Sequence, residues 1–364
     1  MRKVNMELFR IVTMIMIVLI HFLVHGGIIA AAEQFSIQYY VLWTLCSICY
    51  VSVNGYVLLT GYFQYESKFK LKKIILLMAE VLFYSVAIYA ILYFTGNVEL
   101  NATDLSLSLL PTINRAYWFT TNYVGLYVLS PFFNWVLKRI NKKQHTLLLV
   151  VLITFFSVWP TFSVLSTGLN LGGPFGTDWF AVLYCIGAYF RKYYVVKKEK
   201  IKLIVGYVLT AIALPMSKFV IAKFVEKTSI TLIPDDMFFY YNSILVLISS
   251  VLLFLIFLNI EIKNKYAKVL IGFFAPATLG VYLIHDNLFG RVWLWNTLKV
   301  HQYIQNEKLY LIMAGIVMGI YLGCSLIDKV RHLLFKRLGE SKWLEDICKN
   351  IEQFFMKVYL TFDE

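Results

Sequence analysis

Charged residues are scarce in this 364-residue chain. They make up 15% of the sequence, against about a quarter in an ordinary soluble domain, while 60% of the residues are hydrophobic. This composition excludes a soluble globular protein and indicates a protein that crosses a membrane several times. Acidic residues are the scarcer charge, with 21 Asp and Glu against 34 Lys and Arg. Because most of the basic residues lie in short segments between apolar spans, we ascribe the net charge of +13 to orientation in the membrane and expect no nucleic-acid partner.

Cysteine is sparse as well. The chain has five, an odd number, and four of them lie in apolar spans, so we predict no disulfide framework. Cys46 and Cys49 have the spacing of a metal or redox pair, but no second Cys or His pair lies near them in the sequence. We interpret both as packing residues and expect no metal in this protein.

Long apolar spans dominate the rest of the sequence. Ten stretches are apolar and long enough to be read as transmembrane helices: 7–29, 38–61, 74–95, 117–137, 145–163, 177–194, 202–222, 237–260, 269–290 and 309–327. The first of them lacks the small-residue cleavage site of a signal peptide, so we expect it to remain in the protein. Of the 34 Lys and Arg, 27 lie on the side that carries both ends of the chain, which predicts cytoplasmic termini.

The predicted fold class is therefore an all-α integral membrane protein of about ten transmembrane helices. Residues 1–327 form the predicted membrane domain, and 328–364 form an amphipathic tail at the cytoplasmic surface. The loops on the opposite side are polar and modest in length, so no additional catalytic domain fits in any of them. We conclude that the helices themselves must supply any activity.

The first span carries ionisable residues that are costly inside a bilayer. Arg10 and His21 are eleven residues apart, so on a helix they lie on one stripe, about 20° apart around the axis and roughly 16 Å apart along it. His25 follows one turn later. Such residues inside a membrane span indicate a functional site. Two structural alternatives stay open: Arg10 as an interfacial anchor paired with Glu7, and His21 as the donor or acceptor of an interhelical hydrogen bond.

Several short motifs resemble one family of membrane enzymes. The Arg10 to His21 spacing in a first helix is similar to that of the acyltransferase 3 family, which O-acylates extracytoplasmic glycans. Further stretches resemble the same family: Asn54-Gly55-Tyr56 through Thr60-Gly61-Tyr62-Phe63, Tyr117-Trp118-Phe119 through Leu129-Ser130-Pro131, and Val281-Tyr282-Leu283-Ile284-His285. Thr60 stands where the family usually has Ser. The resemblance extends over most of residues 4–290.

The resemblance implies an activity. It predicts an O-acyltransferase of the plasma membrane that moves an acetyl group from cytoplasmic acetyl-CoA to a hydroxyl of a cell-surface or exported polysaccharide, or of a lipid-linked saccharide. Arg10 would bind the donor phosphates, because a guanidinium forms two parallel hydrogen bonds to an anion. His21 would be the general base, because burial disfavours the charged form of an imidazole and leaves it able to accept a proton. A covalent acyl-histidine is the alternative, and His25 is expected to assist.

Residues outside the first helix complete the predicted site. We expect Lys72 and Lys73 to contribute to donor binding, although basic runs also serve as topology signals. For the acceptor we expect His285, Asp286, Asn54 and Trp118. The simpler alternatives are a solvated helix end for His285 and Asp286, and a helix-packing hydrogen bond for Asn54.

Other function classes also fit a polar stripe in a membrane helix. The main alternative is a transporter or exporter of glycan or acyl intermediates, in which the same Arg and His would form a substrate or proton path. A structural or sensory subunit of a biosynthetic complex is a third. Gly315, Gly319 and Gly323 are spaced four apart in the last span, which favours close helix packing and is consistent with a homodimer.

Overall fold

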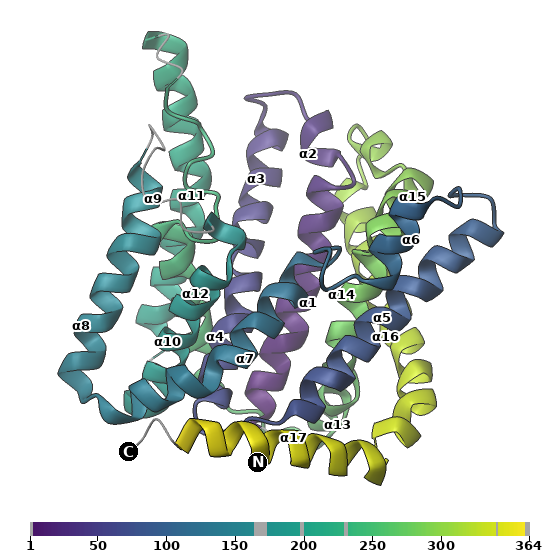
Figure 1. The fold of residues 1–364 in the computed structure, drawn as a ribbon. Coiled ribbons are helices and arrows are strands. Elements are labelled where there is room, and N and C mark those ends of the chain that lie inside the picture. The colour runs from purple at the N-terminus through teal and green to yellow at the C-terminus, as the bar shows by residue number, and fades with distance from the viewer. Residues whose placement is uncertain (1–2, 164–172, 197–199, 229–231, 340, 361–364) are drawn as a thin grey trace.

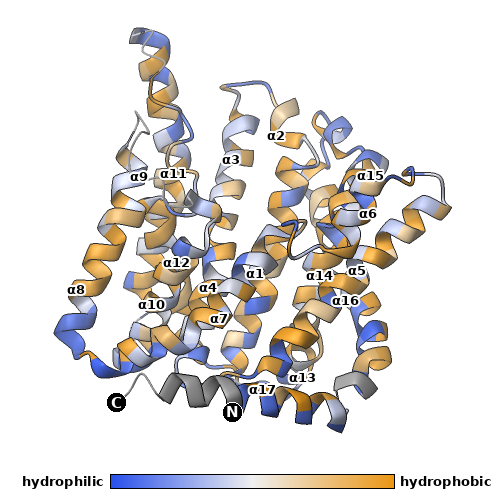
Figure 2. Ribbon diagram, viewed as in Figure 1, coloured by the Kyte–Doolittle hydropathy of each residue, from blue (hydrophilic) through white to orange (hydrophobic). Residues whose placement is uncertain are grey.

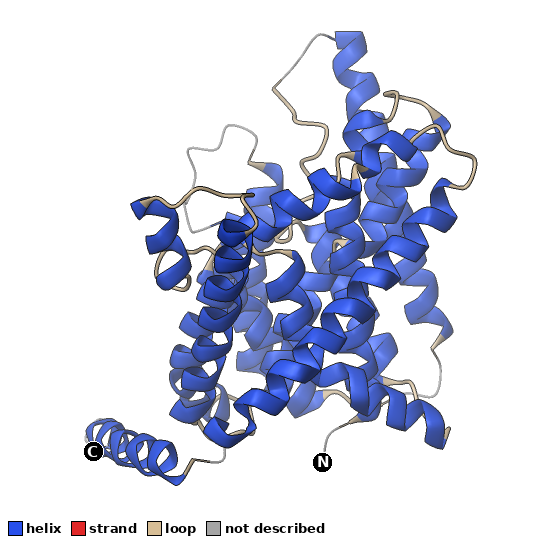
Figure 3. Ribbon diagram, turned by 90° about the vertical axis from the view of Figure 1, so that its right-hand side faces the viewer, coloured by secondary structure: helices blue, strands red, loops and turns tan. Residues whose placement is uncertain are grey.

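The computed structural model describes residues 3–163, 173–196, 200–228, 232–339 and 341–360 (Figure 1). Parts of the expected outer loops at 164–176 and 224–236, and of the basic segment 191–202, lie outside these residues. Every regular element in the described residues is a helix (Figure 3). In chain order these are α1 (Val4–Val24), α2 (Ile28–Ala31), α3 (Ile37–Cys49), α4 (Ser52–Gln64), α5 (Leu71–Phe94), α6 (Ala102–Leu109), α7 (Trp118–Arg139), α8 (Lys142–Ile153), η1 (Thr154–Val158), α9 (Trp159–Phe162), η2 (Gly173–Phe175), α10 (Thr177–Tyr193), α11 (Ile201–Thr228), α12 (Ile244–Leu258), α13 (Lys265–Phe274), η3 (Ala275–Ala277), α14 (Thr278–His285), α15 (Leu288–Leu298), η4 (Val300–Tyr303), α16 (Leu309–Gly339) and α17 (Lys342–Leu360).

Helix occupies most of each of the ten spans expected from the sequence. In the described part of the chain, seven helical segments are long and apolar enough to cross a membrane, and α12 is a shorter apolar helix. Figure 2 shows apolar residues along the middle of the bundle and hydrophilic ones toward its two ends. The prediction of an all-α membrane protein is thereby confirmed, while the number of crossings and the orientation stay predictions. The start of α1 and helix α17 lie at the same end of the molecule (Figure 1).

Helix α1 lies at the centre of the bundle. It packs against α3, α4, α12, α13, α14 and α16. Near its start, Met6 and Phe9 belong to an apolar core built with α4, α10 and α12, whereas Val18 and Phe22 belong to a second core built with α14 and α16. Because α1 joins the two cores, its polar stripe lies between the two halves of the bundle rather than facing lipid.

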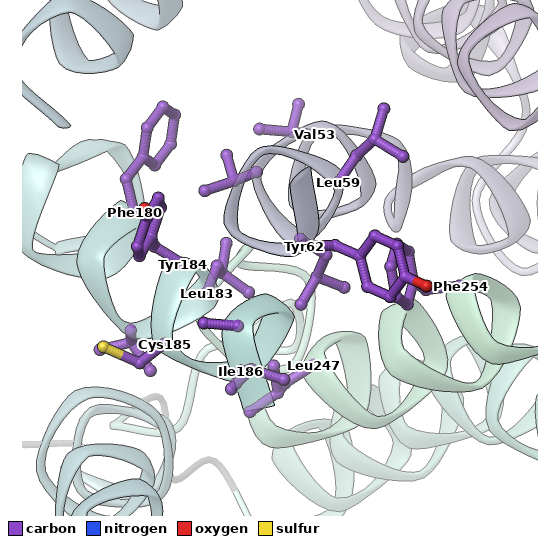
Figure 4. Packing of buried hydrophobic residues seen from close by; sticks show 14 of the residues in the cluster. Val53, Leu59, Tyr62, Phe180, Leu183, Tyr184, Cys185, Ile186, Leu247 and Phe254 are labelled. Carbon is purple, nitrogen blue, oxygen red and sulfur yellow. The ribbon is translucent and has the colours of Figure 1, made fainter. Parts of the chain in front are cut away.

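Helices α4 and α10 cross with their backbones in contact. A Cβ atom on Gly61 would lie 2.2 Å from the carbonyl oxygen of Tyr184, and one on Gly187 would lie 2.2 Å from that of Leu58. Only glycine permits this approach. Figure 4 shows the apolar side chains that fill the space around the crossing and extend to Phe254 of α12. Gly61 of the Thr60-Gly61-Tyr62 motif is therefore required by packing.

The ninth span is broken in the middle, and residues at the break line the cavity described below. Helix α13 ends at Phe274, and the short 3-10 turn with Pro276 separates it from α14. Proline has no backbone N–H and disrupts the hydrogen bonds of a continuous helix. Both Ala275 and Pro276 lie on the wall of the cavity described below.

Helix α16 runs across the domain boundary expected at residue 327. Beyond it, buried Asp328 and Arg331 form an ion pair with Nε–Oδ1 at 2.8 Å, and Arg331 contacts Glu80 of α5 at 3.1 Å. Glu80 lies within the apolar helix α5, and its basic partner comes from a distant part of the chain. Carboxylates from α5 and α16 thus share one guanidinium and join the two helices.

The glycine stripe of α16 has no neighbour within the described chain. A Cβ atom placed on Gly315, Gly319 or Gly323 would meet no atom within 4 Å. This face is therefore open to lipid or to a second copy, and the homodimer stays a prediction.

Helix α17 lies across the end of the bundle at the start of α5, where Lys72 Nζ is 3.6 Å from Glu345 Oε2.

Candidate active site

Arg10 and His21 line one cavity. The cavity has a volume of about 350 Å³ and lies between α1, α4, α5, α7 and the broken helix α13–α14. The eleven-residue spacing predicted that both side chains share one stripe of α1, and the structure places them on the same wall. Apolar side chains line most of the cavity between and around them, among them Met14, Ile17, Ile20, Leu59, Leu77 and Leu279.

Three polar side chains meet His21 at the far end of this cavity. Nδ1 of His21 lies 2.9 Å from Nε2 of His285 and 3.7 Å from Oδ1 of Asp286. The His25 ring is 4.7 Å from the His21 ring, and its Nε2 lies 3.9 Å from the same Asp286 oxygen. Arg291 donates to this oxygen at 3.1 Å. The structure therefore brings His285 and Asp286 together with His21 and His25, whereas their roles stay predictions.

The end of α14 is held in place by a second hydrogen-bonded chain. The Tyr117 hydroxyl donates to the carbonyl of Leu283 at 2.9 Å, and the side-chain amide of Asn287 donates to that hydroxyl oxygen at 2.7 Å. The Asn287 side-chain oxygen also caps α15 by accepting from the backbone N–H groups of Phe289 and Gly290. Tyr117 and Asn287 are both 1% exposed. These bonds fix the backbone that carries His285 and Asp286.

At the other end of the cavity, Arg10 is only loosely paired. Its Nη1 lies 3.7 Å from Oε1 of Glu7, which is beyond hydrogen-bond distance, and its side chain is 36% exposed. The Tyr56 hydroxyl donates to the Arg10 carbonyl at 2.8 Å and ties this turn of α1 to α4. The guanidinium therefore retains donors for an anion, which a tightly paired anchor would not.

Aromatic residues also line the cavity. The indole of Trp118, expected to contact the acceptor, stacks on Tyr241 with ring centres 5.9 Å apart and planes 20° apart. Tyr56, Tyr123, Tyr241 and Tyr282 also line the cavity and were not singled out from the sequence. Tyr56 and Tyr282 stand in the motifs that carry the family resemblance, which could have identified them. Tyr241 precedes α12 with no motif that would single it out.

Five of the expected site residues do not line the cavity: His25 and His285 contact His21, which does line it, whereas Asn54, Lys72 and Lys73 lie elsewhere. Asn54 is buried and fully engaged, because its amide donates to the Tyr241 carbonyl at 2.7 Å and its oxygen accepts from the Trp179 indole at 3.0 Å. This is the packing alternative for Asn54. Lys72 is near Glu345, and the Lys73 ammonium lies 5.9 Å from the centre of the Tyr127 ring. The structure does not bring these three residues to the cavity.

Three potential metal ligands lie at the His21 end of the cavity. His21, His25 and Asp286 offer three ligand atoms within 4.8 Å of one another. However, Nδ1 of His21 is within hydrogen-bond distance of His285, and Oδ1 of Asp286 accepts from Arg291. A cation that used these two atoms would displace both contacts. The same atoms therefore fit a hydrogen-bonded network better than a metal centre.

Comparison with known proteins identifies the family. No curated protein and no solved structure matches this chain. The family model described as the acyltransferase domain of the acyltransferase 3 type matches residues 3–328, which include both cavity walls and every residue of the histidine cluster. The chain therefore belongs to the acyltransferase 3 family of membrane acyltransferases.

Proposed function

We propose that this protein moves an acetyl group from cytoplasmic acetyl-CoA to a hydroxyl of a cell-surface or exported polysaccharide at the plasma membrane. Family membership establishes the coarser statement, a membrane acyltransferase. The observation that carries the finer proposal is the single cavity shared by Arg10 and His21. It joins a cation near one end of α1 to an imidazole roughly 16 Å away along the helix.

In this proposal the donor lies in the cavity in one direction. The phosphates of acetyl-CoA are placed at Arg10, which retains hydrogen-bond donors, and the extended pantetheine arm is of the same order of length as the Arg10–His21 separation. Apolar side chains between the two ends suit the arm and exclude water from the thioester. The acetyl carbonyl then lies near His21.

The reaction proceeds by proton abstraction and attack. His21 takes the proton of the acceptor hydroxyl, the hydroxyl oxygen bonds to the acetyl carbon, and the C–S bond breaks with release of the thiolate. Asp286, 3.7 Å from His21 Nδ1, stabilises the imidazolium that forms. His25 assists at the partly exposed rim. In the covalent alternative, His21 first carries the acetyl group itself.

The acceptor is placed against the aromatic wall. Trp118 and Tyr241 present rigid, largely apolar ring surfaces with polar tips, which suit the mixed apolar and hydroxylated faces of a sugar. The distribution of basic residues between the spans predicts that the Arg10 end of the cavity is on the cytoplasmic side and the His21 end toward the outside. Donor and acceptor therefore enter from opposite sides.

Reconstitution tests the proposal. Purified protein in lipid vesicles is supplied with acetyl-CoA carrying a radioactive acetyl group and with glycan, and label on the glycan is counted. We expect transfer by the wild type and by the matched control His332→Gln, whose side chain is exposed on α16, and a loss of about 10²- to 10⁴-fold in His21→Gln. Gln imitates one imidazole hydrogen bond but cannot take the proton at neutral pH. Transport of glycan without any acetylation by the wild type would favour the exporter alternative.

A further inference from the structure

Hydrogen bonds around His21 decide which of its ring nitrogens carries the proton. Nδ1 of His285 lies 2.6 Å from the carbonyl oxygen of Val281. A carbonyl can only accept, so this nitrogen of His285 is protonated and donates. In the neutral ring the other nitrogen, Nε2, is then an acceptor, and it lies 2.9 Å from Nδ1 of His21. Nδ1 of His21 must therefore carry a hydrogen, and its Nε2 has a free lone pair.

We propose that His285 is a positioning residue, which holds His21 as the Nδ1–H tautomer and thereby makes Nε2 of His21 the atom that takes the hydroxyl proton. This inference rests on the proposed function and replaces the acceptor-binding role expected for His285. A residue that is hydrogen-bonded to the non-reacting nitrogen of a catalytic or metal-binding imidazole commonly sets its tautomer.

The surrounding structure makes His285 the group that sets the tautomer. Its side chain is 1% exposed, and the Tyr117–Asn287 chain fixes the end of α14 that carries it. Asp286 is the competing acceptor, but its Oδ1 lies 3.7 Å from His21 Nδ1 and already accepts from Arg291 at 3.1 Å. A contact of 3.7 Å is too long for a hydrogen bond, so Asp286 acts on His21 through charge alone.

The proton balance during transfer follows from this arrangement. The acceptor O–H bond breaks and its proton binds to Nε2 of His21, while the hydroxyl oxygen bonds to the acetyl carbon and the thiolate leaves with the C–S electron pair. His21 becomes an imidazolium whose Nδ1–H still donates to His285. Its positive charge lies near the carboxylate of Asp286. No rotation of the His21 ring is needed between the neutral and the charged form.

The tautomer can be measured without any activity assay. We suggest full-length protein labelled with ¹⁵N-histidine in lipid nanodiscs, with the His21 resonances identified by their loss in His21→Gln. Nitrogen shifts distinguish a protonated from a bare ring nitrogen. We expect His21 to show a protonated Nδ1 and a bare Nε2 in the wild type, and a mixture of tautomers in His285→Phe. A wild-type His21 with a protonated Nε2 would overturn the assignment.

Steady-state kinetics of folded His285 variants provide a second test of the positioning role. His285→Phe fills the same space but accepts no hydrogen bond, so we expect kcat to fall by about 10- to 100-fold while the KM for acetyl-CoA changes less than about twofold. His285→Gln offers an amide oxygen to His21 Nδ1–H and should recover part of that loss. Wild-type kcat in folded His285→Phe would refute the positioning role. Because the His21→Gln result decides the proposed function separately, the two failures are distinguishable.

Discussion

Nε2 of His285 lies 2.9 Å from Nδ1 of His21, although 264 residues separate the two in the sequence. The contact joins α1 to α14. The distance therefore depends on how α14 is placed against α1, and the break at Pro276 and the Tyr117–Asn287 chain are what place it.

Removal of the Arg10 guanidinium should weaken donor binding. We expect Arg10→Ala to lower the affinity for CoA by about 10- to 100-fold, the scale of one or two hydrogen bonds to a charged group, while the protein still folds. Arg10→Lys should recover little of the loss, because an ammonium does not form the two parallel bonds of a guanidinium. Isothermal titration calorimetry on purified protein measures both. Unchanged affinity in Arg10→Ala would reduce the residue to a membrane anchor.

Neutralisation of Asp286 should slow transfer without affecting the donor. Asp286→Asn removes the negative charge beside His21 and leaves the Arg291 guanidinium without its counter-charge. Both effects disfavour an imidazolium, so we expect kcat to fall by about 10- to 100-fold with little change in the KM for acetyl-CoA. Steady-state kinetics with Asp346→Asn, an exposed carboxylate on α17, provides the control. A fully active Asp286→Asn protein would argue against charge stabilisation at this position.

The α4–α10 crossing should be intolerant of a single methyl group. Gly61→Ala would bring a Cβ atom to 2.2 Å from the Tyr184 carbonyl oxygen, so the helices must separate. We expect a loss of stability of about 1–3 kcal/mol or more, seen as a lower midpoint of thermal unfolding in detergent. Gly319→Ala is the matched control, since its Cβ atom meets nothing within 4 Å. Equal midpoints for the two variants would contradict the close crossing.

The predicted orientation can be tested by labelling. All five native cysteines are buried, which keeps the background low. A cysteine at Asn101 should react with a membrane-impermeant maleimide in intact cells, and one at Lys143 should react only after the membrane is opened. Both positions are exposed in the fold. The reverse pattern would place the termini outside and would invert the direction of acetyl transfer.

Features that depend on one helix or on composition could be predicted from the sequence. Hydrophobic length predicted helical membrane spans because a bilayer requires about twenty apolar residues for each crossing. Helical periodicity predicted the shared stripe of Arg10 and His21, since 3.6 residues per turn relate positions within one helix regardless of its neighbours. The residues of the family motifs also gave Trp118 a place at the site, and it lines the cavity.

Features that depend on two helices were decided by the tertiary structure. The sequence does not specify which helix faces which. It therefore could not show that His285 accepts a hydrogen bond from His21 or that Tyr241 stacks on Trp118. Nor could it show that the Asn54 side chain forms hydrogen bonds that join packed helices. Glu80 shows the same limit, because its partner Arg331 lies 251 residues away on α16. Local periodicity sets the direction of a side chain on its own helix, whereas packing of the apolar faces determines what that side chain meets.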